Sequence, residues 1–213
     1  MKNHKTHTDD GKKRKQKGRF LIRLGLLLIA AALCFVIYNL YEEHRAREQS
    51  GQAFDALQEY IPGSDQNDDT SMPDYMLNPD IEMPTQTIDG IDYIGVLEIP
   101  SLNLELPVIS QWSYPNFRIA PCRYSGSAYS GGLVIAAHNY DSHFGRLKTL
   151  QTDDEVIFTD IDGNTFTYKV AVMEILEPLA TEEMKSEEWD LSLFTCTIGG
   201  RSRVTVRCVL DDQ

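Results

Sequence analysis

The longest apolar run in the chain extends from Phe20 to Tyr41 and contains a single charged residue, Arg23. As an α-helix rising about 1.5 Å per residue, this run would be about 33 Å long, enough to cross a hydrocarbon core of about 30 Å. We therefore predict a transmembrane signal anchor at residues 20–41. Residues 1–19 are rich in Lys and Arg, which predicts a basic cytoplasmic tail and an extracellular location for the rest of the chain.

The sequence of this run leaves two alternatives to an anchor. A cleaved signal peptide would fit the three alanines at residues 30–32, but the apolar run continues beyond them to Ile37. Lipid modification of Cys34 is disfavoured, because Leu33 stands where Gly or Ala usually precedes a lipidated cysteine. An uncleaved, single-pass anchor is the interpretation we favour.

The segment after the predicted anchor carries two patterns. In residues 42–60, the apolar side chains Phe54, Leu57 and Tyr60 recur at helical spacing, which predicts a stalk helix that either leaves the membrane or packs on the following domain. Residues 61–89 contain four prolines among many Asp, Asn and Ser residues. We predict a linker with little ordered structure there.

From residue 90 the pattern changes to short β-prone runs separated by turn residues, which predicts one extracytoplasmic domain at residues 90–213. The Asp162-Gly163 pair is a strong hairpin signal. Strands at this spacing are typical of a closed barrel or a sandwich, and the spacing alone does not choose between them. The predicted strands are Tyr93–Ile99, Leu104–Ile109, Gly132–Ala137, Glu155–Asp160, Thr165–Leu176, Leu191–Cys196 and Arg203–Leu210, with short helical pieces at Tyr114–Ile119, Phe144–Gln151 and Thr181–Glu187.

Composition narrows the class of protein. A chain of 213 residues with 42% hydrophobic residues can bury a core, so it is not wholly disordered. The net charge is −12 overall and +7 in the first 23 residues, so residues 24–213 carry −19. So acidic a domain is a poor partner for nucleic acid, whose phosphates require a basic surface.

The candidate chemistry centres on two strands that flank a Gly-Gly turn. If the leucines of Leu191–Cys196 face a core, Cys196 points away from it, because successive strand residues alternate between faces. If the valines of Arg203–Leu210 face the same core, Arg203 points outward as well. The turn then brings a thiol beside a guanidinium. Arg201 and Arg207 share this parity, but Arg201 lies in the turn and Arg207 well inside the strand, so Arg203 is preferred.

A thiol nucleophile also requires a base. Three of the five histidines lie before residue 90, which leaves His138 and His143. His138 closes an apolar run that begins at Gly132, so we expect its ring at a strand end facing a site. His143, in the following loop, is the alternative base.

The remaining cysteines suggest no metal site. Cys122 and Cys208 could pair in an extracytoplasmic setting, although we favour a loop or barrel-wall residue for Cys122 and a small buried strand residue for Cys208. No CxxC pair or Cys/His spacing typical of zinc occurs, so neither a metal nor a cofactor is predicted.

The order of these motifs resembles the sortase family, the cysteine transpeptidases of Gram-positive cell surfaces. The motifs are Ile94–Pro100, Leu106-Pro-Val, Ala136-Ala-His138-Asn, Ser192-Leu-Phe-Thr-Cys196 and Arg203. The resemblance covers roughly residues 90–210 and implies an eight-stranded β-barrel with short helices. Ser192 replaces the first Thr of the family's TLxTC pattern, and Ala137 replaces a common Gly. Residues 119–127 and 137–145 look more similar to class B-type sortases.

The resemblance also implies roles and partners. Cys196 would be the nucleophile, His138 the general acid and base, and Arg203 the group that holds the substrate or stabilises the oxyanion, while Thr195 would help to shape the oxyanion region of the substrate-binding site. The substrate would be an LPxTG-type sorting signal, cleaved through a thioester and transferred to an amine of cell-wall precursor or a pilin lysine. The alternatives are a sortase that acts mainly as a hydrolase and a catalytically idle, membrane-tethered peptide-binding barrel.

Overall fold

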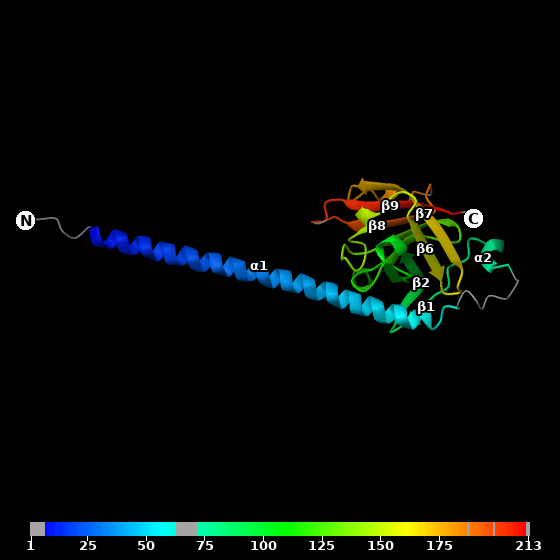
Figure 1. Ribbon diagram of the computed structural model, residues 1–213, viewed down its shortest axis with the longest axis horizontal. Helices are drawn as coiled ribbons and strands as arrows, with labels where there is room; N and C mark the ends of the chain where they lie inside the picture. The colour runs from blue at the N-terminus through cyan, green and yellow to red at the C-terminus, as the bar shows by residue number, and fades with distance from the viewer. Residues whose placement is uncertain (1–6, 63–71, 187, 198, 212–213) are drawn as a thin grey trace, which may run out of the picture. The chain divides into compact units, whose positions relative to one another are not determined.

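The computed structural model describes residues 7–62, 72–186, 188–197 and 199–211. Its chain divides into two units, one up to His44 and one from Arg45 onward, which we describe separately (Figure 1). Helix α1 (His7–Gln58) contributes residues to both units.

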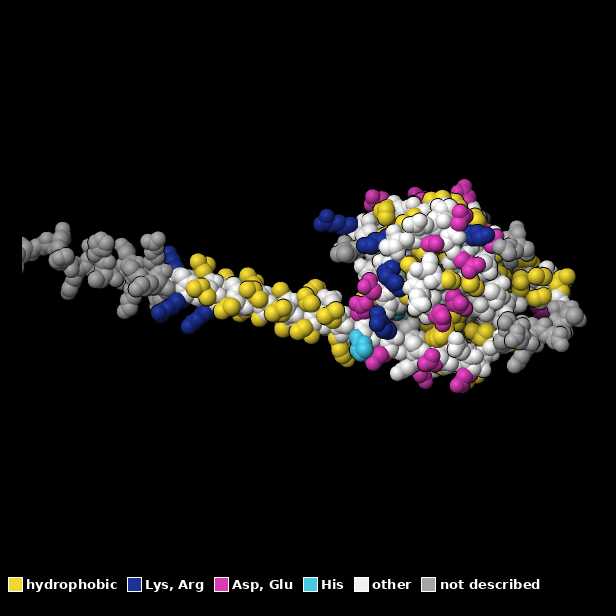
Figure 2. Space-filling view, in the orientation of Figure 1, with side chains coloured by type: hydrophobic (Ala, Val, Ile, Leu, Met, Phe, Trp, Pro, Cys, Tyr) yellow, Lys and Arg dark blue, Asp and Glu magenta, His cyan; other side chains and the backbone are white. Residues whose placement is uncertain are grey.

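The first unit is helical and its apolar side chains are exposed. In the described part of the chain, one helical segment, Lys17–Gln58, is long and apolar enough to cross a membrane, with a mean hydropathy of 2.7 in its most apolar stretch. Figure 2 shows the hydrophobic side chains that cover this segment. The helix therefore has the length and composition predicted for a membrane span, and its orientation across a membrane stays a prediction.

The second unit is built around a closed barrel of eight strands (Figure 1). Neighbouring strands follow the order β2-β3-β4-β5-β8-β9-β7-β6, and β6 pairs with β2 to close the barrel. The pairs β3–β4 and β5–β8 are parallel, and the other barrel pairs are antiparallel. The strands are β2 (Ile91–Ile99), β3 (Leu104–Ile109), β4 (Cys122–Ser127), β5 (Gly131–Ala136), β6 (Glu155–Asp160), β7 (Thr165–Leu176), β8 (Leu191–Cys196) and β9 (Arg203–Leu210).

The eight-stranded barrel implied by the sortase resemblance is thus confirmed, and all seven predicted strands form. The predicted hairpin connects β6 to β7, where Gly163 adopts the positive φ of 84° that favours glycine. The helical pieces are shorter than predicted. They are α3 (Tyr114–Phe117), α4 (Thr181–Met184) and the 3-10 turn η3 (Leu147–Thr149), with a further 3-10 turn, η2 (Pro100–Leu102), before β3.

Two strands, β1 and β4, were not predicted. Strand β1 lies in the predicted linker, and the prediction of a poorly ordered linker is wrong for residues 72–89. That segment contains the short helix α2 (Asp74–Leu77) and strand β1 (Gln86–Ile88), which pairs with the start of β2 as a ninth strand. The side chain of Met83 is 4% exposed and belongs to the barrel interior. Residues 63–71 of the predicted linker lie outside the described residues.

Both faces of the barrel wall are packed. One cluster fills the interior and includes Leu191, Leu193 and Val206. A second cluster lies on the other face and includes Phe194, together with Ala53 and Leu57 from the last turns of α1. Leu57 is fully buried, so this part of the predicted stalk helix packs on the barrel. Burying apolar side chains on both faces makes the strand that ends at Cys196 a rigid support.

Candidate active site

Three adjacent strands bring Cys196, His138 and Arg203 to one edge of the barrel. In the parallel pair β5–β8, Ala136 lies opposite Phe194, so the same register two residues later sets His138 beside Cys196. In the antiparallel pair β8–β9, Cys196 lies directly opposite Arg203. Neighbouring strands are about 4.8 Å apart, which keeps all three backbones close together.

The side chains of Cys196, His138 and Arg203 line one cavity of about 380 Å³. That volume lies in the range of small-molecule and peptide-anchoring pockets. Aromatic side chains form much of its wall, and the segment between β7 and β8 supplies the rest. The other lining residues are Trp112, Tyr114, Phe117, Tyr124, Glu177, Pro178, Ala180, Thr181, Met184 and Phe194.

The predicted facing of Cys196, away from the barrel interior, is confirmed. Leu191 and Leu193 point into the interior, whereas Phe194 belongs to the cluster on the opposite face, the face that Cys196 shares by strand alternation. Cys196 is a free thiol and is half-buried at the cavity. A thiol in this setting is supported by β8 and accessible to a ligand in the cavity.

Two aromatic rings hold the imidazole of His138. Its ring centroid lies 4.3 Å from that of Phe117 and 4.9 Å from that of Tyr140, which stacks on it at 27°. Burial lowers the pKa of His138, and the positive charge of Arg118 lowers it further. Both effects favour the neutral imidazole.

These aromatic partners were not predicted from the sequence. Tyr140 follows His138 by two residues in the same loop, so an aromatic residue close to a candidate base was an available signal. Phe117 comes from α3, and only the folded chain brings it to His138.

His143, the alternative base, is fully buried and does not line the cavity. Neither of its ring nitrogens has a hydrogen-bond partner among the described residues. Burial lowers its pKa to about 4, with a smaller contribution from the charge of His138. The side chain of His143 is therefore packed inside the domain and is not exposed to a substrate.

The three candidate arginines lie in different environments. Arg203 lines the cavity, and its Nη1 donates to the carbonyl oxygens of Gly200 at 3.3 Å and Ser202 at 3.2 Å. Arg201 is exposed and lies outside the cavity lining. Arg207 is only 1% exposed and belongs to the structural core.

Arg207 connects the wall of the cavity to the barrel. Its Nη1 donates to the carbonyl oxygen of Met184 at 3.1 Å and to Ser192 Oγ at 2.8 Å, and its Nε donates to Glu174 Oε1 at 2.6 Å. Met184 itself lines the cavity. The guanidinium therefore fixes α4 against β7 and β8, and the family departure at Ser192 retains the hydroxyl that this contact uses.

Thr195 connects strand β8 to Ala137, the residue that precedes His138. Its Oγ1 donates to the carbonyl oxygen of Ala137 at 2.8 Å, and the residue is 3% exposed. The hydroxyl thus fixes the residue before His138 against the residue before Cys196. The implied contribution of Thr195 to substrate binding stays a prediction.

The two other cysteines of the barrel domain are free and buried on opposite faces of its wall. Cys122 belongs to the outer cluster and Cys208 to the interior, and burial raises the pKa of each thiol to about 12. The favoured interpretation of both as packing residues is therefore confirmed, and no disulfide joins them.

A barrel that presents a thiol, an imidazole and a guanidinium to one cavity has the groups used by thiol-dependent acyl-transfer enzymes. Comparison with known proteins agrees with this class. The model of the sortase domain family matches residues 97–211, more than half of the chain. The chain therefore belongs to the sortase family, whose members are cysteine transpeptidases.

Individual relatives are distant. Sortase A of Bacillus anthracis is 25% identical over 184 residues, which are 79% of this chain and 85% of that protein. Sortase D of Bacillus subtilis (strain 168) is 28% identical over 107 residues, which are 48% of this chain, and the chain spans about half (53%) of that relative. The structure of a Clostridium perfringens sortase D5 transpeptidase superimposes with a TM-score of 0.58 at 17% identity, covering 77% of this chain and 99% of that one. The resemblance to class B-type sortases stays a prediction.

Proposed function

We propose that this chain is a membrane-anchored transpeptidase that cleaves an LPxTG-type sorting signal and transfers the acyl group to an amine. The observation that carries the proposal is the shared cavity of Cys196, His138 and Arg203. Family membership supports the reaction type. The substrate, the amine and the residue roles are what we infer beyond it.

In the first step, Cys196 reacts as the thiolate, with its proton held by His138, and its sulfur attacks the carbonyl carbon of the substrate peptide bond, so that a C–S bond forms. The C–N bond then breaks as protonated His138 donates its proton to the departing amine nitrogen. The product is a thioester on Cys196 and a released peptide fragment. The lowered pKa of His138 makes its protonated form a stronger acid for this donation.

In the second step, an incoming amine attacks the thioester carbonyl. Neutral His138, the form that its lowered pKa favours, accepts a proton from this amine. A C–N bond forms, the C–S bond breaks, and Cys196 returns as a thiolate. Water in place of the amine would give hydrolysis.

Arg203 is the proposed donor to the oxyanion that forms in both steps. Its position opposite Cys196 and at the cavity supports this role. The planar guanidinium has several N–H groups, so its contacts with the carbonyls of Gly200 and Ser202 leave donors available to a substrate oxygen.

The N-terminal helix supports an anchored enzyme with a cytoplasmic N-terminus and an extracellular catalytic domain. The apolar segment is long enough for one span, and the basic residues of the tail precede it. An acceptor amine of cell-wall precursor or of a pilin lysine would be accessible on that side of the membrane.

The proposal is tested by mass spectrometry of the full chain in detergent micelles, incubated with a pooled pentapeptide library with and without added amines. We expect an acyl adduct on Cys196 in the absence of amine, and a peptide–amine product in its presence. The Cys196→Ala variant is the matched control and should show neither. Peptide binding without any adduct or product would identify an idle binding barrel, and cleavage that never yields an amine product would identify a hydrolase.

A further inference from the structure

The imidazole of His138 has no hydrogen-bond partner among the described residues. Asn139 and Asp141 follow it in the loop and carry suitable oxygens, but neither side chain is bonded to the ring. Enzymes that use an imidazole as acid and base usually orient it through a third group. A different kind of contact therefore has to fix the orientation of His138.

The contacts that hold this imidazole are aromatic. The ring of Tyr140 stacks on it with centroids 4.9 Å apart and an angle of 27°, and the ring of Phe117 lies 4.3 Å away at 48°. An aromatic face also attracts a positive charge, so these contacts suit the imidazolium as well as the neutral ring. They therefore restrict rotation of the imidazole in both of its protonation states.

The backbone of the loop fixes Tyr140 in turn. The carbonyl oxygen of Tyr140 accepts the N–H groups of His143 at 2.9 Å and Gly145 at 2.8 Å. The N–H of Phe144 donates to the carbonyl oxygen of His138 at 3.0 Å, and the Phe144 side chain is fully buried in the barrel interior. A Cβ at Gly145 would lie only 2.8 Å from the carbonyl oxygen of Tyr140, so this close backbone contact requires glycine. The barrel core thus supports the position of Tyr140.

We propose that Tyr140 is a positioning residue whose ring holds the imidazole of His138 in the orientation that faces Cys196. Tyr140 lies outside the lining of the cavity, so it acts through His138 and not on the substrate. Phe117 is the second support of the same ring. The inference rests on the proposed function, because it assigns to Tyr140 an effect on proton transfer by His138.

Replacing Tyr140 leaves the charged groups around the imidazole in place. Burial and then Arg118 lower the pKa of His138, and neither depends on a charge carried by Tyr140. The charged and titratable groups near the imidazole are Cys196, Glu177, Arg203, Tyr114 and Tyr124 at the cavity, Arg118 at the end of α3, and Asp141 and His143 in the loop. A variant of Tyr140 therefore changes the support of His138 and not its charged surroundings.

The first test requires no peptide. The rate at which iodoacetamide alkylates Cys196 is measured against pH in the full chain in detergent micelles, with the alkylated cysteine identified by mass spectrometry. Because the thiolate is the reactive form, a nearby imidazolium moves the midpoint of this profile to lower pH. His138→Gln should raise the midpoint, and Tyr140→Leu, which is apolar but has no ring, should raise it by at least about half as much. Tyr140→Phe retains the ring and should keep the wild-type midpoint.

The second test measures the initial rate of acyl-adduct formation on Cys196 with the pooled pentapeptide library. Misplacing a catalytic group by about 1 Å can cost about 10²-fold in rate. Tyr140→Leu should therefore lower the rate about 10-fold to 100-fold, whereas Tyr140→Phe should stay within about threefold of the wild type.

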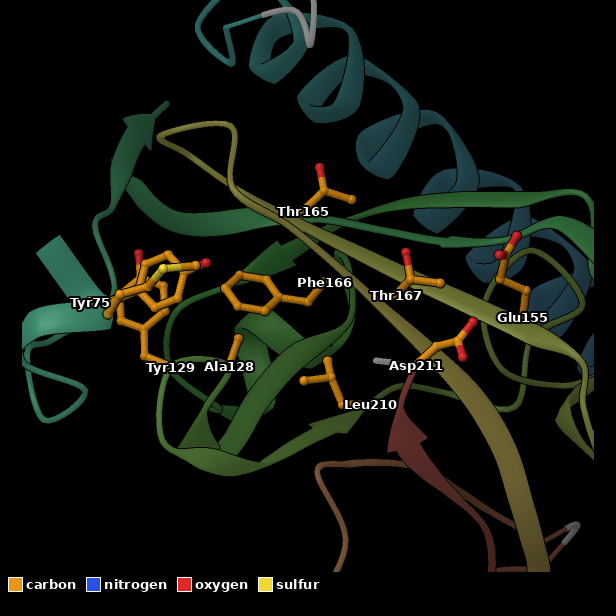
Figure 3. Close-up of a pocket in the computed structure, with 10 residues that line it drawn as sticks. Tyr75, Ala128, Tyr129, Glu155, Thr165, Phe166, Thr167, Leu210 and Asp211 are labelled. Atoms are coloured by element: carbon orange, nitrogen blue, oxygen red, sulfur yellow. The ribbon is translucent and has the colours of Figure 1, made fainter. Parts of the chain in front are cut away.

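Tyr75 provides a matched control, because it is also half-buried and stacked on an aromatic ring. Figure 3 shows Tyr75 beside Tyr129 at a second cavity, of about 520 Å³, whose lining includes none of Cys196, His138 and Arg203. The two tyrosine rings have centroids 4.6 Å apart and an angle of 11°. Tyr75→Leu removes a comparable ring and should change neither the alkylation profile nor the rate of adduct formation.

The outcomes separate this proposal from the proposed function. A wild-type profile in Tyr140→Leu, together with a shifted one in His138→Gln, would overturn the role of Tyr140 and leave the proposed function in place. Equal shifts in Tyr140→Leu and Tyr140→Phe would assign the effect to the hydroxyl, and an equal effect of Tyr75→Leu would assign it to general packing, so each would overturn positioning by the ring. An unchanged profile in His138→Gln would overturn the pairing of His138 with Cys196, and with it both proposals.

Discussion

The cavity at Cys196 and the fully buried positions of the barrel domain use the same three residue types in opposite ways. At the cavity a cysteine, a histidine and an arginine are half-buried, whereas their counterparts are at most 1% exposed. The pairs are Cys196 and Cys208, His138 and His143, and Arg203 and Arg207. Residue type alone therefore does not define a role in this barrel, and contact with the cavity separates the member of each pair that we propose to be catalytic from the member that packs in the interior of the protein.

The largest expected difference is between the two cysteines. Cys196→Ala removes the proposed nucleophile and should lower the rate of peptide cleavage by at least about 10⁴-fold with little change in stability. Cys208→Ala removes a buried sulfur and should lower the free energy of unfolding by about 1–2 kcal/mol without changing kcat. Chromatographic assay of the cleaved peptide and urea unfolding measure the two effects. Similar residual activity in both variants would contradict the assignment of the nucleophile.

The arginine pair should separate rate from stability. Arg203→Ala should lower kcat by about 10²–10³-fold, the loss typical of an oxyanion donor, while the protein unfolds as the wild type does. Arg207→Ala leaves the carbonyl of Met184 and the hydroxyl of Ser192 without their buried charged donor and should destabilise the domain by about 3–5 kcal/mol. Steady-state kinetics on the folded fraction, together with thermal unfolding, checks both. A large loss of kcat only in Arg207→Ala would reverse the roles.

These contrasts also show what the sequence could and could not predict. Alternation within Leu191–Cys196 and Arg203–Leu210 was sufficient to predict that the thiol of Cys196 and the guanidinium of Arg203 point away from the barrel interior, because strand periodicity is local. The preference for Arg203 over Arg207 used position in the strand, but the buried contacts of Arg207 depend on residues from β7, β8 and α4. Such partners are distant in the sequence and leave no local pattern.

Strand β4 escaped prediction for a related reason. Its sequence, Cys-Arg-Tyr-Ser-Gly-Ser, lacks apolar alternation, and Gly126 packs so closely that a Cβ would lie 1.9 Å from the carbonyl oxygen of Gly132. Pairing with β5 therefore defines this strand more than its own side chains do. The aromatic partner Phe117 of His138 is likewise a product of the tertiary fold.

The histidine pair predicts a pH dependence of stability. Since the pKa of His143 is lowered to about 4 in the folded state, the unfolded state binds the proton first as the pH falls below about 6.5. The contribution of neutral His143 to stability is complete above pH 6.5 and is lost as the pH falls toward 4. The loss in the free energy of unfolding is about 2 kcal/mol at pH 5.

The His143→Leu variant should therefore lose less stability than the wild type between pH 7 and pH 5, as measured by urea unfolding at each pH. His138→Gln is the matched comparison. The ring of His138 lies half-buried at the cavity, so removing it should change the dependence of stability on pH less than removing His143 does. Identical pH slopes in the wild type and His143→Leu would show that the buried imidazole does not control this range.

The smallest expected effect tests whether the buried contacts of Arg207 influence the cavity. Ser192→Ala removes one acceptor of the Arg207 guanidinium, which also holds the carbonyl of the cavity residue Met184. Loss of a hydrogen bond to a charged group costs about 1.5–3 kcal/mol. Because the same guanidinium holds Met184, this loss should make the part of the cavity wall formed by α4 less rigid. We expect KM for the peptide to rise about threefold to tenfold, with unchanged alkylation of Cys196 by iodoacetamide, a reagent too small to need that wall. Ser192→Thr retains the hydroxyl and should preserve KM, whereas equal KM values in all three proteins would confine the buried network to stability alone.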